Sequence, residues 1–178
     1  MIRIQIPKGY INHAKKLTEE FDSQKTWDKY KCNNNYLGYL GEKMFHEWME
    51  KLGIPHIWIK FIKQSNSDSD FIINGFSFDL KTTFGLKLRL REPKFDYYIF
   101  SRVTDEVKEH LLIGYIAKEK LIRLIKEDKL QKVGSDYYCP ISEMDPFEVM
   151  FREIFKKRDI WTDKIQGGDI FEILCSTL

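Results

Sequence analysis

The chain has 178 residues and a mass of 21.4 kDa, the usual size of one domain, and 43% of its residues are hydrophobic, enough for a core. With only 10 glycines and 5 prolines it is not a disordered or fibrous chain, and its net charge of +2 excludes a histone-like polycation. No apolar run near the N-terminus is long enough for a signal peptide or a membrane span, so we expect a soluble cytoplasmic protein without membrane contact. Cys32, Cys139 and Cys175 are scattered, which favours ordinary buried thiols in a reducing compartment.

The spacing of apolar residues predicts helices first, then three strands, and then strands alternating with helices. Helices are predicted over about 11–21, 34–52, 118–128 and 145–159, strands over 54–61, 96–103 and 110–117, and a hairpin over 70–83. Gly53 ends the second helix, and the last helix is predicted to have Asp145 as its N-cap and Pro146 at its first position. This order favours a layered α/β domain with a mixed sheet.

Asn74 and Gly75 are the most informative pair of residues in the predicted hairpin. Asn-Gly is the strongest short-range hairpin signal, because both central residues of a type I′ turn need positive φ. In the register that this turn sets, Asp70 lies directly opposite Asp79. Side chains alternate between the two faces of a strand, so one face carries Asp68, Asp70, Asp79 and Lys81. The opposite, core-facing side carries Phe71, Ile73, Phe76, Phe78 and Leu80.

Two directly opposed aspartates need an explanation, because like charges at that separation destabilise a sheet. A divalent cation supplies one, since Mg²⁺ is bound through carboxylate oxygens and keeps several waters. Lys81 leans toward the same spot, where an ammonium could hold a metal-bound water or offset charge on a phosphate. The alternative interpretation is a solvated polar loop at Asp68 and Asp70 beside a surface ion pair between Asp79 and Lys81.

The hairpin and the helix before it resemble the PD-(D/E)XK nuclease superfamily, which includes many restriction enzymes and archaeal Holliday-junction resolvases. Asp70 matches the first acid of the motif, Asp79-Leu80-Lys81 matches its (D/E)-x-K element, and Glu42 matches the glutamate often found on the first helix. Ser69 stands where the motif usually has proline, and Asp68 competes with Asp70 for the role of first acid. The resemblance covers about residues 34–128. It implies an α/β fold with a restriction-endonuclease-like αβββαβ core, in which helices flank a central mixed sheet.

The resemblance also implies a single nuclease-like domain over 1–178, with helical additions at both ends, and a role for each matched residue. Asp70, Asp79 and the Leu80 carbonyl would bind Mg²⁺ or Mn²⁺. Glu42 would hold a second metal or a metal-bound water. Lys81 would orient or activate the attacking water.

Residues 81–94 form the most basic stretch of the chain, and they directly follow the acidic motif. They hold five cations against the single acid Glu92, a local charge of +4. If the segment is extended, alternation with leucines puts its central cations on one side, where they could carry phosphates toward the metal. The predicted nucleic-acid contacts are Lys87, Arg89, Arg91 and Lys94. A solvated strand edge guarded by charge is the alternative.

Other chemistries find little support in the sequence. No Walker or dinucleotide-binding pattern surrounds the glycines, and no nucleophilic triad is indicated. The four histidines (His13, His46, His56 and His110) are scattered and show no metal-ligand spacing, and the only pair worth noting is Glu42 and His46, four residues apart on the predicted helix.

The sequence therefore predicts a metal-dependent nuclease, a hydrolase acting on phosphodiester bonds. DNA is the expected substrate, and RNA is not excluded. One alternative is a branched-DNA resolvase acting as a homodimer. Another is a nucleic-acid-binding module that keeps the fold without cleaving.

Overall fold

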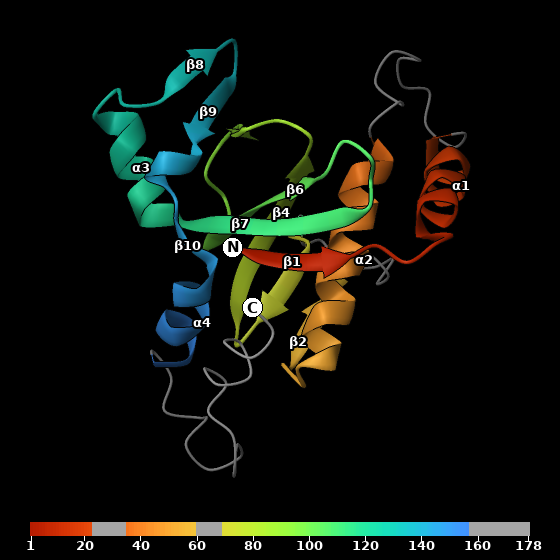
Figure 1. Cartoon of the computed structure of the whole chain (residues 1–178). Coiled ribbons are helices and arrows are strands. Elements are labelled where there is room, and N and C mark those ends of the chain that lie inside the picture. The colour runs from red at the N-terminus through yellow and green to blue at the C-terminus, as the bar shows by residue number, and fades with distance from the viewer. Residues whose placement is uncertain (23–34, 60–68, 157–178) are drawn as a thin grey trace.

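The structure, a computed structural model, describes residues 1–22, 35–59 and 69–156 (Figure 1). Its α-helices in these ranges are α1 (Tyr10–Asp22), α2 (Asn35–Lys51), α3 (Lys118–Lys126) and α4 (Phe147–Lys156). The strands of the large sheet are β1 (Ile2–Gln5), β2 (His56–Trp58), β3 (Phe71–Ile73), β4 (Phe76–Thr83), β6 (Tyr97–Val103), β7 (Glu109–Ala117) and β10 (Asp145–Pro146). A second sheet contains β5 (Lys87–Leu90), β8 (Gln131–Val133) and β9 (Asp136–Pro140).

The large sheet is mixed, and its strand order is β1-β7-β6-β4-β3-β2, with β10 added beside β7. Strands β4 and β6 pair in parallel, whereas the other pairs are antiparallel. The small sheet has the order β5-β9-β8, and β8 and β9 lie beside α3 at one side of the large sheet (Figure 1). The predicted mixed α/β class is confirmed.

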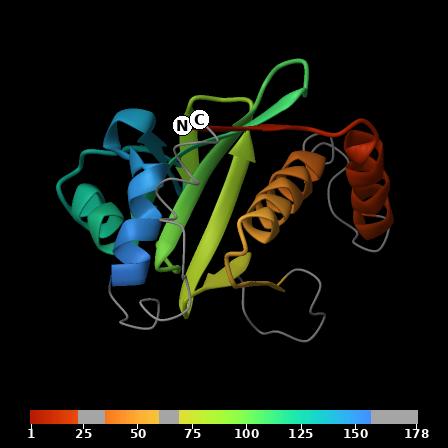
Figure 2. The same ribbon diagram turned by 60° about the horizontal axis from the view of Figure 1, so that its bottom comes forward.

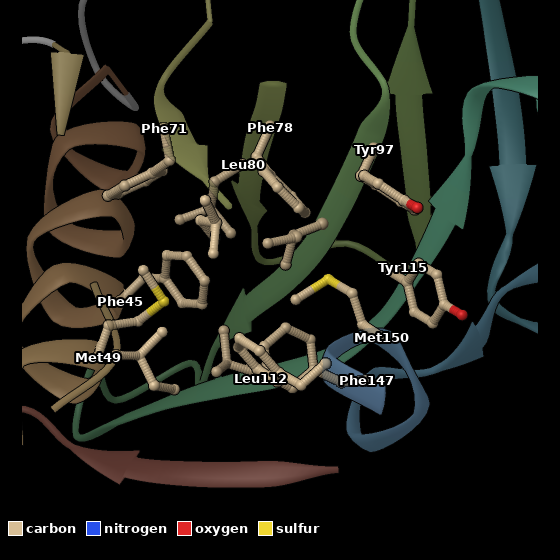
Figure 3. Packing of buried hydrophobic residues seen from close by; sticks show 14 of the residues in the cluster. Phe45, Met49, Phe71, Phe78, Leu80, Tyr97, Leu112, Tyr115, Phe147 and Met150 are labelled. Atoms are coloured by element: carbon tan, nitrogen blue, oxygen red, sulfur yellow. The ribbon is translucent and has the colours of Figure 1, made fainter. Parts of the chain in front are cut away.

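The main core lies on one face of the large sheet, where α2 and α4 both pack. Figure 3 shows side chains of both helices meeting those of β3, β4, β6 and β7 in one apolar layer. Side chains alternate between the two faces of β4, so Phe78 and Leu80 point into the core and Asp79 between them points away. The expected core face of the hairpin is confirmed, with Phe76 partly buried at its edge.

A second apolar cluster lies on the opposite face, between the large sheet, α3 and the small sheet. It includes Tyr98 and Phe100 of β6, Leu121 of α3, and Leu88 and Leu90 of β5. The small sheet is therefore fixed to the large one by buried leucines that alternate with the basic residues of β5. Helix α1 packs on the outer side of α2, away from the strands (Figure 2).

The start of the last helix was predicted wrongly. Asp145 and Pro146 form β10 and pair with Tyr115 and Gly114 of β7, so α4 begins only at Phe147. Backbone pairing prevails here over the local capping preference. Gly114 permits that pairing, because a Cβ atom at this position would lie 2.8 Å from the Asp145 carbonyl oxygen.

The remaining differences lie in short or distant elements. Strand β2 is shorter than predicted, and the sequence did not predict β1, β8 and β9. Two ends of predicted elements, residues 60–61 and 157–159, lie outside the described residues. The element after β4 is the strand β5, where the resemblance implies a helix, so the restriction-endonuclease-like core is not confirmed. Within the described residues, none of the helices is long and apolar enough to cross a membrane. Cys139 is a buried free thiol, and Cys32 and Cys175 lie outside the described residues.

Candidate metal and phosphate site

The hairpin between β3 and β4 has the predicted register. Asn74 and Gly75 have φ values of 49° and 80°, as a type I′ turn requires, and Ile73 pairs with Phe76. The ladder ends with Phe71 opposite Phe78, so the predicted pairing of Asp70 with Asp79 is not part of it. The Asp70 amide still donates to the Phe78 carbonyl at 2.9 Å.

Asp70 lies where β3 separates from β4. Its carboxylate accepts a hydrogen bond from the Leu80 amide at 2.9 Å, so this amide bonds to a side chain and not to a backbone carbonyl of the neighbouring strand. In a strand, the N–H and C=O of one residue point to the same edge, so the Leu80 carbonyl faces the edge at which Asp70 lies. The Leu80 carbonyl, which the resemblance implies as a metal ligand, thus lies at the same edge of β4 as Asp70.

Glu42 reaches this place because α2 packs very closely on β4. A Cβ atom at Gly41 would lie 1.8 Å from Thr82 Oγ1, so only glycine allows this approach. The next residue, Glu42, is 3% exposed and accepts a hydrogen bond from Trp58 Nε1 at 3.2 Å. The carboxylates of Glu42, Asp70 and Asp79 are hereafter called the acid cluster.

The pKa of Asp70 reflects its burial and the charges of the two other carboxylates. Burial, followed by the charges of Glu42 and Asp79, raises this pKa to about 8, although the hydrogen bond from the Leu80 amide and the charge of Lys81 lower it. At pH 7 the Asp70 carboxyl therefore favours its protonated form. A divalent cation could take the place of that proton.

Lys81 is the cation that the chain itself supplies. Its Nζ lies 2.8 Å from Asp79 Oδ1, and the Asp79 side chain is 5% exposed whereas that of Lys81 is 45% exposed. Burial alone would lower the pKa of Lys81, but Asp79, with help from Asp70 and Glu42, raises it. Lys81 is therefore an ammonium at neutral pH.

A pocket of about 590 Å³ opens beside Asp79 and Lys81. Three of the four predicted nucleic-acid contacts line it and are hereafter called the basic wall: Arg89, Arg91 and Lys94. Tyr98 lies in the same lining, where its hydroxyl accepts hydrogen bonds from the amides of Lys94 and Phe95 and so holds the loop before β6. Asp79 and Lys81 thus line the same pocket as the basic wall, whereas Glu42 and Asp70 are not in its lining.

Asp136 of β9 is a pocket residue that sequence reasoning missed. Arg89 donates to its carboxylate from Nε at 2.8 Å, and Arg91 Nε lies 3.4 Å from its other oxygen. The two arginine side chains are still 62% and 75% exposed, so their guanidinium groups remain accessible. Lys87 is not part of the pocket lining and donates to Gln131 instead.

The most compact set of possible metal ligands is elsewhere. Among the described residues, His46, Glu50 and His56 form a group whose ligand atoms all lie within 4.8 Å of one another and could hold a metal ion. The spacing of the histidines along the sequence did not indicate this group, which the fold brings together. Asp68, the competitor for the first acid, lies outside the described residues.

No known family model, no curated protein and no solved structure matches the chain. The arguments for its function therefore come from its own residues.

Proposed function

We propose that the protein is a metal-dependent nuclease that hydrolyses phosphodiester bonds, with DNA as the expected substrate. The observation that carries this proposal is one pocket that joins Asp79 and Lys81 to the basic wall. We also propose that α2, β2, β3 and β4 correspond to the first αβββ part of the PD-(D/E)XK core, because Glu42, Asp70 and Asp79 come from those elements in the expected order.

The acid cluster fits a divalent cation. Asp79 contacts the Lys81 ammonium at 2.8 Å, and the charges of Glu42 and Asp79, together with burial, favour the protonated form of Asp70. Mg²⁺ needs only one or two carboxylates and keeps waters, so Asp70 and Asp79 would hold it, with the Leu80 carbonyl beside them and Glu42 reaching it through a water. When bound, the ion would lower the pKa of a coordinated water and offset phosphate charge.

The remaining steps fall to the protein's own side chains. Lys81 would donate hydrogen bonds from its ammonium to the attacking water or to a phosphate oxygen, while Asp79 holds that ammonium in place. The basic wall would bind the phosphates that flank the scissile bond. Asp136 keeps the two arginines of the wall oriented until phosphate takes its place.

A panel of substrates tests the proposal: supercoiled, linear, single-stranded and four-way-junction DNA, and RNA, each with Mg²⁺, Mn²⁺ or EDTA. We expect cleavage of DNA with either metal and none with EDTA, and its loss in Lys81→Met. Asp105→Asn, an exposed aspartate before β7, is the matched control and should cut like wild type. Binding of every substrate without cleavage of any would instead favour the non-cleaving module. Selective cleavage of junctions by a dimer would favour the resolvase.

A further inference from the structure

The end of α2 and the start of β2 bring two histidines together. His46 and Glu50 are one turn apart on α2, so both lie on the same side of the helix. The chain then reverses at Gly53, whose φ is 67°, and the Ile54 amide donates back to the Met49 carbonyl at 3.0 Å. This turn places β2, which begins at His56, beside the end of α2 (Figure 1).

The hydrogen bonds of His56 determine which of its nitrogens is available. His56 Nδ1 lies 2.8 Å from the Ile54 carbonyl oxygen, which can only accept, so Nδ1 carries the proton. In the neutral ring Nε2 then has the lone pair, and it points at His46 Nδ1 at 2.7 Å. A backbone carbonyl that orients a histidine in this way is the usual second contact of a metal-ligating imidazole.

Glu50 supplies the third ligand atom. Its Oε1 lies 4.0 Å from His56 Nε2, and its side chain is 64% exposed, so it can close over the two rings without disturbing the core. The His56 side chain is only 1% exposed and is fixed in place. Bonds of about 2.0–2.1 Å to a tetrahedral ion would require the two ring nitrogens, now 2.7 Å apart, to separate by only about 0.6 Å.

We propose that His46, Glu50 and His56 form a metal site of the zinc class, separate from the acid cluster. Two imidazoles and one carboxylate suit Zn²⁺, with water as the fourth ligand, whereas Mg²⁺ prefers oxygen ligands alone. The proposal rests on this geometry and not on the proposed nuclease activity.

The site would act as a clamp between α2 and β2. The His46 ring lies 4.6 Å from the ring of Trp58, the last residue of β2, and Trp58 Nε1 donates to Glu42. Joining the helix to the strand through a metal would therefore fix the position of Trp58 and, through it, of Glu42. Zn²⁺ bound here would stabilise the folded protein, because the ion binds the folded state.

The test is a titration of chelator-stripped protein with Zn²⁺ by calorimetry and with Co²⁺ by visible absorption. We expect one equivalent bound by wild type, with the spectrum of a four-coordinate Co²⁺ ion, and a rise in melting temperature. His46→Gln and His56→Gln should each weaken binding at least a hundredfold, because a lost ligand costs at least as much as a lost second contact. His13→Gln, on α1, is the matched control and should bind like wild type.

Two further variants separate this proposal from others. Glu50→Gln changes only an exposed side chain, so it should fold normally and bind Zn²⁺ at least tenfold more weakly. Asp70→Asn, which removes a ligand of the proposed nuclease site, should leave the zinc site unchanged. Equal Zn²⁺ affinity in wild type and His46→Gln, or no stoichiometric uptake by wild type, would overturn the proposal.

Discussion

Asp70→Asn tests whether the acid cluster is strained in the absence of a cation. Burial and the neighbouring carboxylates raise the pKa of Asp70 to about 8 in the folded protein, from 3.8 for the free side chain. An acid whose pKa rises on folding stabilises the protein below the lower of these values. That stability is lost as the pH rises toward the higher value, because the unfolded chain then ionises more easily than the folded one. Asparagine cannot ionise, and its Oδ1 can still accept from the Leu80 amide.

The size of the effect follows from the pKa values. One unit of pKa corresponds to about 1.36 kcal/mol, so the interval from 3.8 to pH 7 corresponds to an upper limit of about 4 kcal/mol. We therefore expect Asp70→Asn to be more stable than wild type at pH 7 in EDTA by a few kcal/mol. Near pH 4 the two proteins should be equally stable.

Urea unfolding at pH 4, 7 and 8 in EDTA, repeated with Mg²⁺, measures this difference. With Mg²⁺ wild type should gain stability at pH 7 and the variant should not, because the ion binds the folded acid cluster of wild type. The matched control, Asp105→Asn, changes an exposed aspartate and should follow wild type throughout. If Asp70→Asn is less stable than wild type at pH 7 in EDTA, Asp70 is an ordinary structural residue and the reasoning is refuted.

Three further predictions concern packing, charge and pH. Gly41→Ala should lower the free energy of unfolding by about 1–3 kcal/mol, because its Cβ atom would overlap Thr82. Gly38 has open space around it, so Gly38→Ala should raise the free energy of unfolding by about 0.5–1 kcal/mol. An unchanged melting temperature in Gly41→Ala would contradict the close packing of α2 on β4. Arg91→Gln should weaken DNA binding and make the affinity fall less steeply with salt concentration. Lys87→Gln, outside the pocket, should change neither property. If filter-binding titrations give the same salt dependence for wild type and Arg91→Gln, the basic wall does not bind phosphates. Burial lowers the pKa of His110 to about 3 in the folded protein. Below pH 6.5 His110 is therefore protonated in the unfolded chain but stays neutral in the folded one. Compared with His110→Leu, wild type should therefore lose about 1.4 kcal/mol per pH unit on acidification from pH 6 to 4, and parallel stability curves would exclude this cause.

The sequence predicted features that depend on local geometry, and it missed those that depend on distant pairing. The Asn74-Gly75 turn alone sets the register from Ile73 opposite Phe76 to Phe71 opposite Phe78, so this part of the hairpin was predictable. Asp136 was not, because it meets Arg89 only through pairing of strands 47 residues apart in the chain. His46 and His56 also show no regular spacing, and only the turn at Gly53 brings their rings together.

The start of α4 shows that a local helix signal can be overridden by pairing with a distant strand. Asp145 and Pro146 have the local preferences of a helix start, but β7 offers a pairing edge that the sequence alone does not reveal. Asp145 also receives an ion pair from Lys120 of α3, which a capping role would not explain. Tertiary pairing therefore decides the structure at this position.

The rate of DNA cleavage under single-turnover conditions with Mg²⁺ tests the central claim most directly, when wild type is compared with Asp79→Asn and Asp105→Asn. We predict that Asp79→Asn cuts at least about 100-fold more slowly, because both a metal ligand and the partner of Lys81 are lost, while Asp105→Asn cuts at the wild-type rate. Cleavage by Asp79→Asn at the wild-type rate, or no cleavage by wild type with any divalent metal, would contradict the account.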